Sequence, residues 1–447
     1  MKTQVCIIGA GAGGIGCAYR LIKNGVKVAV VDKNPDFGGT AVFSGVDGWE
    51  PGVSLDGIHS LLYEEMCKIE NGCHVVEIVP NINIFKPENR DNWENHSFAE
   101  RPWGLSLKSD ADYGETLKRC TSLRGNAPMR RLQFEPSALS AAVNRIFANY
   151  SDNLTTFFNC FYVGCTQKDG KVVSVTVSDG EKETEIFADY FVDASADIVL
   201  ARDAGCAYSI GTEGFEDYGE PSADEKSDAI NAVTYVFRIA KVDNCHHIDE
   251  IPQWAKDTDV SLWKATDMRR TVSCLVEYPN GDFNVNMLPT MQGREYFELG
   301  NSADNVCRAR VLHYWRYLQE EKGLKGYTLK HIYNAGVRES YRLKGKYVLR
   351  EQDVRAGMNA GMKAGRAIAI GDHALDIHGK GGMCKELTYP YEIPLECAET
   401  REFDNLFVAC RGASFSHIAS STIRLTRTVM SMGEGVGEYI SEILNKR

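Results

Sequence analysis

The chain has 447 residues, of which 43% are hydrophobic and 25% charged, a composition typical of a folded globular protein with two or three domains. Its formal net charge of −11 argues against nucleic acid or an anionic membrane surface as a main partner. The sequence has no apolar stretch of membrane-spanning length, and no small-residue cleavage site follows its apolar N-terminus, so we expect a cytoplasmic protein without a membrane partner.

The first forty residues follow the pattern of a dinucleotide-binding β-α-β unit. An apolar run from Val5 to Ile8 predicts a buried strand, and Gly9, Gly11 and Gly14 complete G-x-G-x-x-G where that strand must turn into a helix. Gly9 permits the tight turn, Gly11 lets a pyrophosphate approach the backbone, and Gly14 lets helix and strand pack closely. The helix N-terminus offers free N–H groups and a positive dipole end to the phosphates.

An acid suited to a ribose follows at the required spacing. Residues 27–31 predict the second strand, and Asp32 ends it where a carboxylate hydrogen-bonds a ribose with both hydroxyls free. A 2′-phosphate is disfavoured at this place, so NADP is not expected there. The predicted cofactor-binding residues of this unit are Gly9, Gly11, Gly13, Gly14, Asp32, Lys33, Gly39 and Thr40.

Beyond residue 40 the chain alternates between loop-like and helical stretches. Residues 57–70 predict a helix, whereas residues 80–131 mix Pro, Asn, Trp and charged residues without helical or strand period. So long an irregular stretch in a compact protein is usually a functional covering or a loop. Residues 134–150 open with Phe-Glu-Pro-Ser and continue as an amphipathic pattern, which predicts another helix.

Strand signals dominate the centre of the chain. Residues 155–163, 171–177 and 183–187 predict three strands with turns at Asp-Gly pairs between them. Residues 190–197 then predict an apolar strand that closes on small residues.

The segment from residue 208 to 330 differs in character from what precedes it. Acidic and polar loops surround strand-like patches at residues 231–239 and 271–277, and residues 303–321 predict a helix. We therefore predict a second domain inserted into the first. The remaining chain predicts a long helix near residues 354–370, a strand at residues 405–411 and a helix from about Thr428.

The order of these segments resembles the FAD-dependent oxidoreductase family, with its glutathione-reductase-type FAD-binding fold. The N-terminal unit and the third segment below are the more specific matches. Four segments carry the resemblance: the N-terminal unit continued by Gly38-Gly39-Thr40, the strand at residues 190–197, Gly336 to Arg342 followed by Gly345 and Asp353, and residues 405–437.

The resemblance implies an α/β fold with FAD as the cofactor. Residues 1–207 and 331–447 would form a three-layer FAD/NAD(P)-binding domain, and residues 208–330 an inserted α+β substrate or cap domain. FAD is implied rather than NAD because the chain returns to the first domain after residue 330. The sequence also has no second G-x-G-x-x-G that follows a strand, so a separate nicotinamide domain is not expected.

The same resemblance extends the predicted FAD contacts to Ala194, Ser195 and Arg411. Two residues depart from the family pattern, since Ala196 and Cys410 stand where the family commonly has glycine. These departures concern the fine position of the flavin more than FAD binding itself.

His417 and Arg424 are the predicted catalytic residues, because the resemblance places their segment against the flavin ring. A histidine there can move a proton at ordinary pH, and an arginine can hold an anionic substrate group or charge on reduced flavin. The helix from about Thr428 would aim its N-terminus at the pyrimidine end of the ring. An ordinary terminal helix packed on the sheet is the alternative.

Other polar residues leave alternatives open. Arg338 and Arg342 share a face on either a helix or a strand, and suit either a substrate anion or a structural ion-pair network. His373 and His378 flank Asp376, but their mixed spacing favours a wall of the substrate site over a metal site, so we predict no metal. The fourteen cysteines include no C-x-x-C pair, which favours scattered reduced thiols.

Together these features predict an FAD-dependent oxidoreductase that transfers a hydride between the flavin and a small polar metabolite. The alternative is a flavoprotein subunit that passes electrons to a partner, or an FAD-stabilised binding module without its own substrate. An open site lined by Arg and His favours the first, and an exposed apolar face favours the second. A homo-oligomer or a redox partner protein stays open, as do the substrate and the direction of the reaction.

Overall fold

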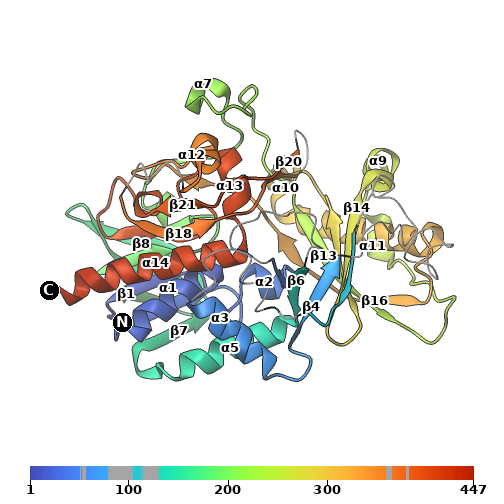
Figure 1. Ribbon diagram of the computed structural model, residues 1–447, viewed down its shortest axis with the longest axis horizontal. Helices are drawn as coiled ribbons and strands as arrows, with labels where there is room; N and C mark the ends of the chain where they lie inside the picture. The colour runs from blue at the N-terminus through green and yellow to red at the C-terminus, as the bar shows by residue number, and fades with distance from the viewer. Residues whose placement is uncertain are drawn as a thin grey trace.

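The computed structural model of the protein describes residues 1–50, 52, 57–78, 104–111, 113, 130–358, 365–378 and 382–446. It has two lobes, each built on its own large sheet (Figure 1). We call them the parallel-sheet lobe, which contains both chain ends, and the mixed-sheet lobe. None of the helices within these described residues has the length and apolarity needed to cross a membrane.

A five-stranded parallel sheet forms the centre of the first lobe. Its strand order is β22-β11-β1-β2-β7, with Val5 paired to Val28 on one side and to Tyr190 on the other. All four residues of β1 are buried, as the apolar run at the start of the chain predicts. The strands are β1 (Val5–Ile8), β2 (Val28–Asp32), β7 (Leu154–Phe158), β11 (Tyr190–Asp193) and β22 (Leu406–Val408).

Two helices from opposite ends of the chain cross on this sheet. They are α1 (Ala12–Lys23) and α14 (Thr426–Asn445). A Cβ on Gly16 of α1 would collide with the carbonyl of Met430, and one on Gly433 of α14 would collide with the carbonyl of Gly13. Glycine is therefore required on both helices, because only glycine lets the two backbones approach so closely.

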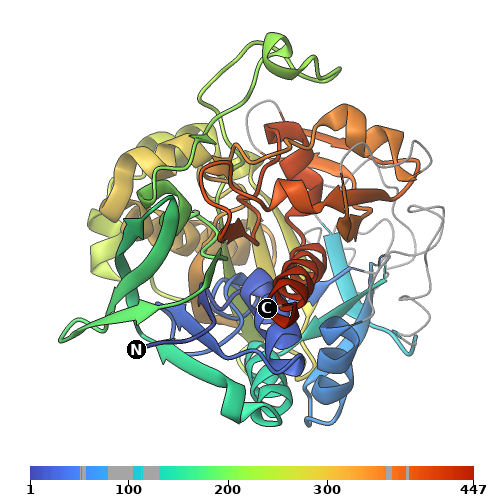
Figure 2. The same cartoon turned by 90° about the vertical axis from the view of Figure 1, so that its left-hand side faces the viewer.

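Further elements surround the parallel sheet. Val172, Val175 and Val177 of β9 belong to the same hydrophobic core as the sheet. Figure 2 shows the β8–β10 meander on one flank of this lobe and α3 on the other. The elements are α2 (Thr40–Phe43), α3 (Ile58–Cys67), α5 (Pro136–Ala148), β8 (Phe161–Lys168), β9 (Lys171–Ser178), β10 (Glu183–Phe187) and α6 (Val199–Asp203).

An eight-stranded mixed sheet forms the centre of the second lobe. Its strand order is β16-β13-β15-β14-β5-β4-β6-β3, and all neighbours are antiparallel except β14 and β5. The strands are β3 (Gly48–Trp49), β4 (Cys73–Ile78), β5 (Gly104–Lys108), β6 (Arg130–Phe134), β13 (Thr234–Lys241), β14 (Val272–Glu277), β15 (Phe283–Leu288) and β16 (Tyr327–Gly336).

The segment at residues 208–330 therefore stays out of the parallel sheet but does not build the second lobe alone. Four of the eight strands come from residues 48–134, joined through Cys274 of β14 and Gly104 of β5. The expectation that residues 80–131 have no strand character is wrong for β5 and for the start of β6. Residues 80–103, 112 and 114–129 of that stretch lie outside the described residues.

Helices of the central segment pack against the mixed sheet. The longest is α11 (Ala303–Glu321), which has the predicted bounds and buries Trp315 against Phe237 of β13 at 6.0 Å between ring centroids. Between residues 208 and 299 the chain also forms a short strand, β12 (Tyr208–Ser209), and four short helices: α7 (Phe215–Tyr218), α8 (Gln253–Asp257), α9 (Ser261–Thr266) and α10 (Gly293–Leu299). Figure 1 shows α7 at the tip of an arm above the parallel-sheet lobe.

The long helix expected near residues 354–370 is wrong. The chain forms the short helix α12, which ends at Gly357 with φ +63°, and later a strand that pairs with residues 391–394. The elements of this region are β17 (Arg342–Leu343), α12 (Glu351–Ala356), β18 (Ala367–Gly371), β19 (Leu375–Ile377), β20 (Met383–Lys385), β21 (Tyr391–Pro394) and α13 (His417–Ile423).

The buried carboxylate of Asp47 connects strands of the mixed-sheet lobe to the segment between α2 and β3. Asp47 accepts hydrogen bonds from Gln133 of β6 at 2.6 Å, from Asn284 of β15 at 2.9 Å, and from the hydroxyl of Tyr278. Burial raises its pKa to about 7, although hydrogen bonds from Tyr278 and Gln133 and the charge of Arg131 act in the opposite direction.

Candidate functional site

The glycine turn between β1 and α1 leaves room at one position. Gly9 has φ +110°, and a Cβ there would collide with the carbonyl of Ala194. A Cβ on Gly13 or Gly14 would also collide with backbone carbonyls. A Cβ on Gly11 would meet only the Cα of Gly39, at an ordinary 3.7 Å. Packing therefore explains the other glycines but not Gly11, and the space beside it fits an approaching pyrophosphate.

The predicted ribose acid is held in place by the turn. Asp32 Oδ2 accepts a hydrogen bond from the backbone N–H of Ala10 at 2.6 Å, and Oδ1 accepts two from Asn34 at 2.7 and 2.8 Å. The side chain is partly exposed, and Oδ2 keeps a second lone pair for a ribose hydroxyl. Lys33 and Thr40 are exposed beside this turn.

Predicted cofactor residues from different strand ends meet around Asp197. Its carboxylate accepts hydrogen bonds from Arg411 at 3.0 Å and from Ser340 at 2.6 Å. Burial alone would raise the pKa of Asp197, but the charges of Arg411 and Lys33 and the Ser340 hydrogen bond hold it below its usual value. Lys33 follows β2 and Arg411 follows β22, so the parallel sheet brings the two cations to one edge.

The turn after β11 is fixed from within. The buried carboxylate of Asp193 accepts hydrogen bonds from the N–H and hydroxyl of Ser195 at 3.0 and 2.6 Å. Ala196 adopts φ +68°, a conformation that glycine reaches at lower cost, which explains why the family pattern favours glycine here. Cys410, the other departure, is buried, and its Sγ accepts from the N–H of Gly412 at 3.4 Å.

Sequence analysis missed a group of buried polar atoms around the start of α14. Trp49 Nε1, His59 Nδ1, Arg427 Nε and Thr428 Oγ1 have no hydrogen-bond partner among the described residues. The rings of Trp49 and His59 lie 4.1 Å apart, and burial, together with the charge of Arg427, lowers the pKa of His59 to about 3. Buried donors without partners are costly, so a ligand with acceptor atoms would stabilise this region.

His417 lies in a buried network whose charges are all paired. Its Nδ1 contacts Glu339 Oε1 at 2.8 Å, and its backbone N–H donates to Glu213 at 2.8 Å. Arg342 donates to both glutamates and to the carbonyls of Gly211 and Phe415. We call Glu213, Glu339, Arg342 and His417 the closed network. Of the two alternatives for Arg342, the structure favours the ion-pair network.

Arg424 lies in a second cluster, which is less completely paired. Its Nη2 donates to Asp376 Oδ2 at 2.8 Å, and the same oxygen contacts His378 Nε2 at 2.8 Å. Its Nε is buried without a partner among the described residues. Arg338 Nη1 donates to the carbonyl of Ala232 at 3.1 Å, not to a carboxylate. We call Arg338, Asp376, His378 and Arg424 the junction cluster.

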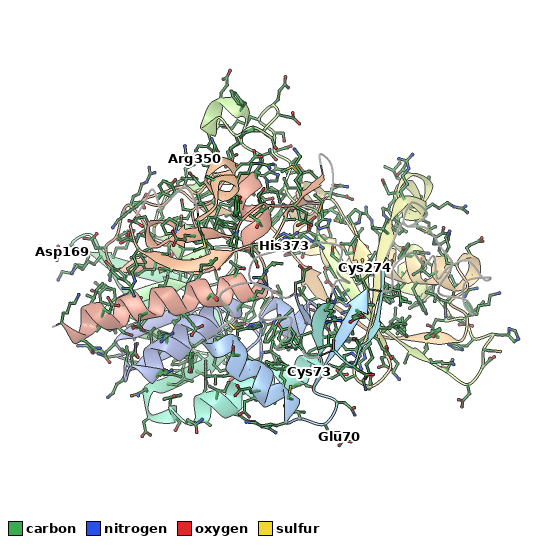
Figure 3. The ribbon with its side chains drawn as sticks, in the orientation of Figure 1. Glu70, Cys73, Asp169, Cys274, Arg350 and His373 are labelled. Atoms are coloured by element: carbon green, nitrogen blue, oxygen red, sulfur yellow. The ribbon has the colours of Figure 1, made fainter. Side chains whose placement is uncertain are left out.

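The junction cluster draws its residues from both lobes. Arg338 follows β16 of the mixed sheet, whereas Asp376 and His378 lie in and just after β19, and Arg424 ends α13. The neighbouring His373 contacts Glu50 at 3.4 Å, and Figure 3 shows His373 where the two lobes meet. Within the described residues, no three His, Cys, Asp or Glu side chains have the arrangement of a metal site.

A parallel sheet whose strand ends carry a glycine turn, the acid at the predicted ribose position and two cations is typical of a dinucleotide-binding α/β protein. Buried donors that await acceptor atoms are consistent with a large, polar cofactor.

The chain belongs to the FAD dependent oxidoreductase family, whose model matches residues 4–445. The protein is therefore an FAD-dependent enzyme, and the predicted family and cofactor are confirmed. The expected mixed α/β fold is also confirmed, whereas its glutathione-reductase-type arrangement stays a prediction.

Other comparisons cover short segments or distant folds. A segment of 40 residues is 55% identical to the glutamate synthase (NADPH) small chain of Halomonas elongata, covering 9% of this chain and 8% of that protein. A geranylgeranyl bacteriochlorophyll reductase-like protein of Thermoplasma acidophilum has 12% identity and a TM-score of 0.48, with 100% of this chain and 79% of that chain covered. A flavoprotein/dehydrogenase of Cytophaga hutchinsonii has 12% sequence identity and a TM-score of 0.48, with 100% of this chain and 80% of that chain covered.

Proposed function

We propose that this enzyme transfers a hydride between FAD and a small polar metabolite held at the junction cluster. The observation that carries the proposal is the contact chain from Arg424 through Asp376 to His378, beside Arg338, which has no carboxylate partner among the described residues. When bound, FAD supplies the hydride chemistry, and the protein's residues supply binding and proton movement. Residues 1–207 with 331–447 would hold the FAD, and the junction between the lobes would hold the substrate.

His378 is the proposed proton carrier. Asp376 accepts the hydrogen bond of His378 Nε2, which fixes the tautomer in which Nδ1 has no proton. Burial and the charge of Arg338 lower the pKa of His378, although the Asp376 hydrogen bond opposes this shift. A neutral imidazole at pH 7 is ready to accept the proton that leaves a hydroxyl or amine when its carbon loses a hydride.

Arg424 keeps its predicted role, and His417 is assigned a different one. Arg424 would hold an anionic substrate group or charge on the reduced cofactor, since its Nε is a buried donor that no described residue pairs with. The proton role expected for His417 passes to His378, because Glu339 already occupies the Nδ1 of His417 inside the closed network.

The experiment is an anaerobic search for flavin reduction or reoxidation. FAD-loaded protein, oxidised or reduced, is mixed with fractions of a metabolite pool while flavin absorbance is followed. We expect one fraction to change the flavin redox state, and His378→Gln to slow that reaction at least about 100-fold with FAD content unchanged. The control is His246→Gln, because His246 is exposed on the mixed-sheet lobe. No response from either redox state would contradict the proposal.

One observation favours the alternative of an electron-transfer subunit. Phe161 and Val163 lie two residues apart on the edge strand β8 and are 56% and 50% exposed. Both side chains are exposed on this edge strand and provide a small amount of apolar surface there. If no metabolite changes the flavin, Phe161→Ser and Val163→Ser should weaken reduction by a cellular electron-carrier protein.

A further inference from the structure

We propose that the substrate carries a carboxylate, and that Arg338 and Arg424 together bind it at the junction cluster. This inference rests on the proposed function in one respect only, namely that the bound carboxylate belongs to the substrate. The binding site itself is argued below from the contacts of the two arginines.

The two guanidinium groups approach each other from different lobes. Arg338 lies two residues beyond the end of β16, and Arg424 is the C-cap residue of α13. Arg338 donates to the carbonyl of Ala232, the N–H of Ala232 donates to the carbonyl of His378 at 3.0 Å, and the His378 ring shares Asp376 Oδ2 with Arg424. These contacts bring the two arginines to one place, and burial together with the charge of Arg424 lowers the pKa of Arg338 to about 9. Folding two arginines together in this way is unfavourable unless an anion joins them.

The acids already present leave part of the donor capacity of the two arginines unused. Asp376 is shared between Arg424 and His378, and Glu50 lies near Arg424 and contacts His373. In the described part of the chain, Arg338 donates to the Ala232 carbonyl and the Thr234 hydroxyl and has no carboxylate partner. Arg424 Nε is a buried donor without a partner there. One planar carboxylate can accept from both guanidinium groups.

The same acids set the charge of the ligand. Asp376 and Glu50 already match the charges of the two arginines, so each further negative charge on a ligand is opposed by these two carboxylates, and the ligand is held by the arginine donors that the acids leave unused. A phosphate carries between about −1.5 and −2 charges at neutral pH and would be repelled by the two carboxylates. The cluster therefore fits a monocarboxylate group better than a phosphate.

The test is a titration of the FAD-loaded protein with propionate, propionamide and inorganic phosphate. Binding is followed by the shift of the melting temperature and by the change in flavin absorbance. We expect propionate to bind, and Arg338→Gln and Arg424→Gln each to weaken it at least about tenfold, the loss expected for a charged hydrogen bond. Arg338→Lys keeps the positive charge but lacks the planar guanidinium that can donate two hydrogen bonds to one carboxylate, so it should weaken binding less than Arg338→Gln.

Arg294→Gln is the matched control, since Arg294 is an exposed arginine paired with Glu298 at 2.9 Å on α10. Equal binding of propionamide, tighter binding of phosphate, or unchanged propionate binding in both glutamine variants would overturn the carboxylate site. If one glutamine variant unfolds, the other glutamine variant and Arg338→Lys still test the site.

A second arm separates this inference from the proposed function. The metabolite pool is divided by anion exchange, and each fraction is mixed anaerobically with oxidised and reduced holoprotein. A flavin response to the retained, anionic fraction supports both proposals. A response to the unretained fraction alone overturns the carboxylate substrate and leaves the hydride-transfer function intact. Propionate binding without a flavin response to either fraction supports the carboxylate site and contradicts the proposed function.

Discussion

The closed network and the junction cluster are built from the same residue types but are completed to different degrees. In the closed network Arg342 donates to Glu213, Glu339 and two backbone carbonyls, so its donors are used inside the protein. In the junction cluster Arg338 has no carboxylate partner among the described residues, and Arg424 keeps an unpaired Nε. Paired buried charges specify the fold, whereas buried charges left incomplete indicate a place for a ligand.

A large loss of stability is expected from breaking the closed network. Arg342→Met would leave Glu213 and Glu339 buried without their cation, and the unfolding free energy should fall by about 3–5 kcal/mol. Arg424→Met removes one cation from Asp376 but leaves its contact with His378 and relieves the repulsion with Arg338, so the loss should be smaller. Urea unfolding of both variants measures the difference. Similar losses would show that the two groups of residues are equivalent.

The same contrast can be tested in the glycine turn. Gly13→Ala should prevent stable folding, because its Cβ would collide with the Ala409 carbonyl. Gly11→Val should fold as apoprotein, since Gly11 has the extended conformation φ −79°, ψ −166°, and its Cβ meets only Gly39. FAD affinity of this variant should fall at least about 100-fold, measured by flavin fluorescence. Retained FAD binding would show that the space beside Gly11 is not the pyrophosphate path.

Substitution of His378 should affect turnover, whereas substitution of His417 should affect stability. His378→Gln is expected to slow flavin reduction by about 100- to 10,000-fold without loss of FAD. His417→Gln should instead lower the unfolding free energy by about 1–3 kcal/mol, because it disturbs a buried hydrogen bond to Glu339. Stopped-flow reduction and urea unfolding of both variants provide the four measurements. A catalytic loss confined to His417→Gln would reverse the assignment.

The pH dependence of stability should distinguish buried acids with opposite shifts. Burial alone would raise the pKa of Glu339, but His417 and Arg342 lower it to about 2. Its contribution is therefore present above its unfolded pKa of 4.5 and is lost as pH falls toward 2. Asp47, whose pKa burial raises to about 7, contributes stability below its unfolded value of 3.8 that is lost as pH rises through 7.

Asp47→Asn isolates the second of these effects. Between pH 4 and 7 the wild-type contribution from Asp47 should fall by up to about 1.4 kcal/mol for each pH unit. The asparagine variant should lack this fall, because it cannot ionise. The measurement is urea unfolding at several pH values, and identical profiles for the two proteins would contradict the role of Asp47.

The smallest effect is expected at the anchor of Arg338. Thr234→Val keeps the side-chain shape but removes the hydroxyl that accepts from Arg338 Nη1. Loss of one hydrogen bond costs about 1 kcal/mol, so propionate binding should weaken about fivefold. Isothermal titration measures this change. The Arg294→Gln control should leave it unaffected.

Elements that depend on residues close together in the sequence could be predicted from sequence patterns. The strand at Val5–Ile8, the helix after the glycines and the position of Asp32 follow from residues that are neighbours in sequence. The bounds of α11 were also predicted, because its apolar residues recur at helical spacing. The family resemblance added FAD, which the first glycine motif alone does not separate from NAD.

Pairings between distant residues could not be predicted in this way. Gly357 ends α12 with a positive φ, and β18 exists because Ala367 pairs with Pro394, so an Ala- and Gly-rich run was wrongly expected to be helical. The Sγ atoms of Cys67 and Cys73 lie 3.6 Å apart, which their spacing in the sequence does not reveal. Arg338 and Arg342 look alike in sequence and differ only in the carboxylates that the fold brings to them.

The crossing of α1 and α14 has a consequence for how the holoenzyme is made. The glycine turn leaves the ribosome early, but Gly433, which packs on Gly13, follows on the order of tens of seconds later at ordinary rates of synthesis. Until then the face of α1 that α14 covers stays in water, and a chain stopped before Thr426 would keep it exposed. Cofactor loading is thus expected to be a late event, after release of the α14 segment.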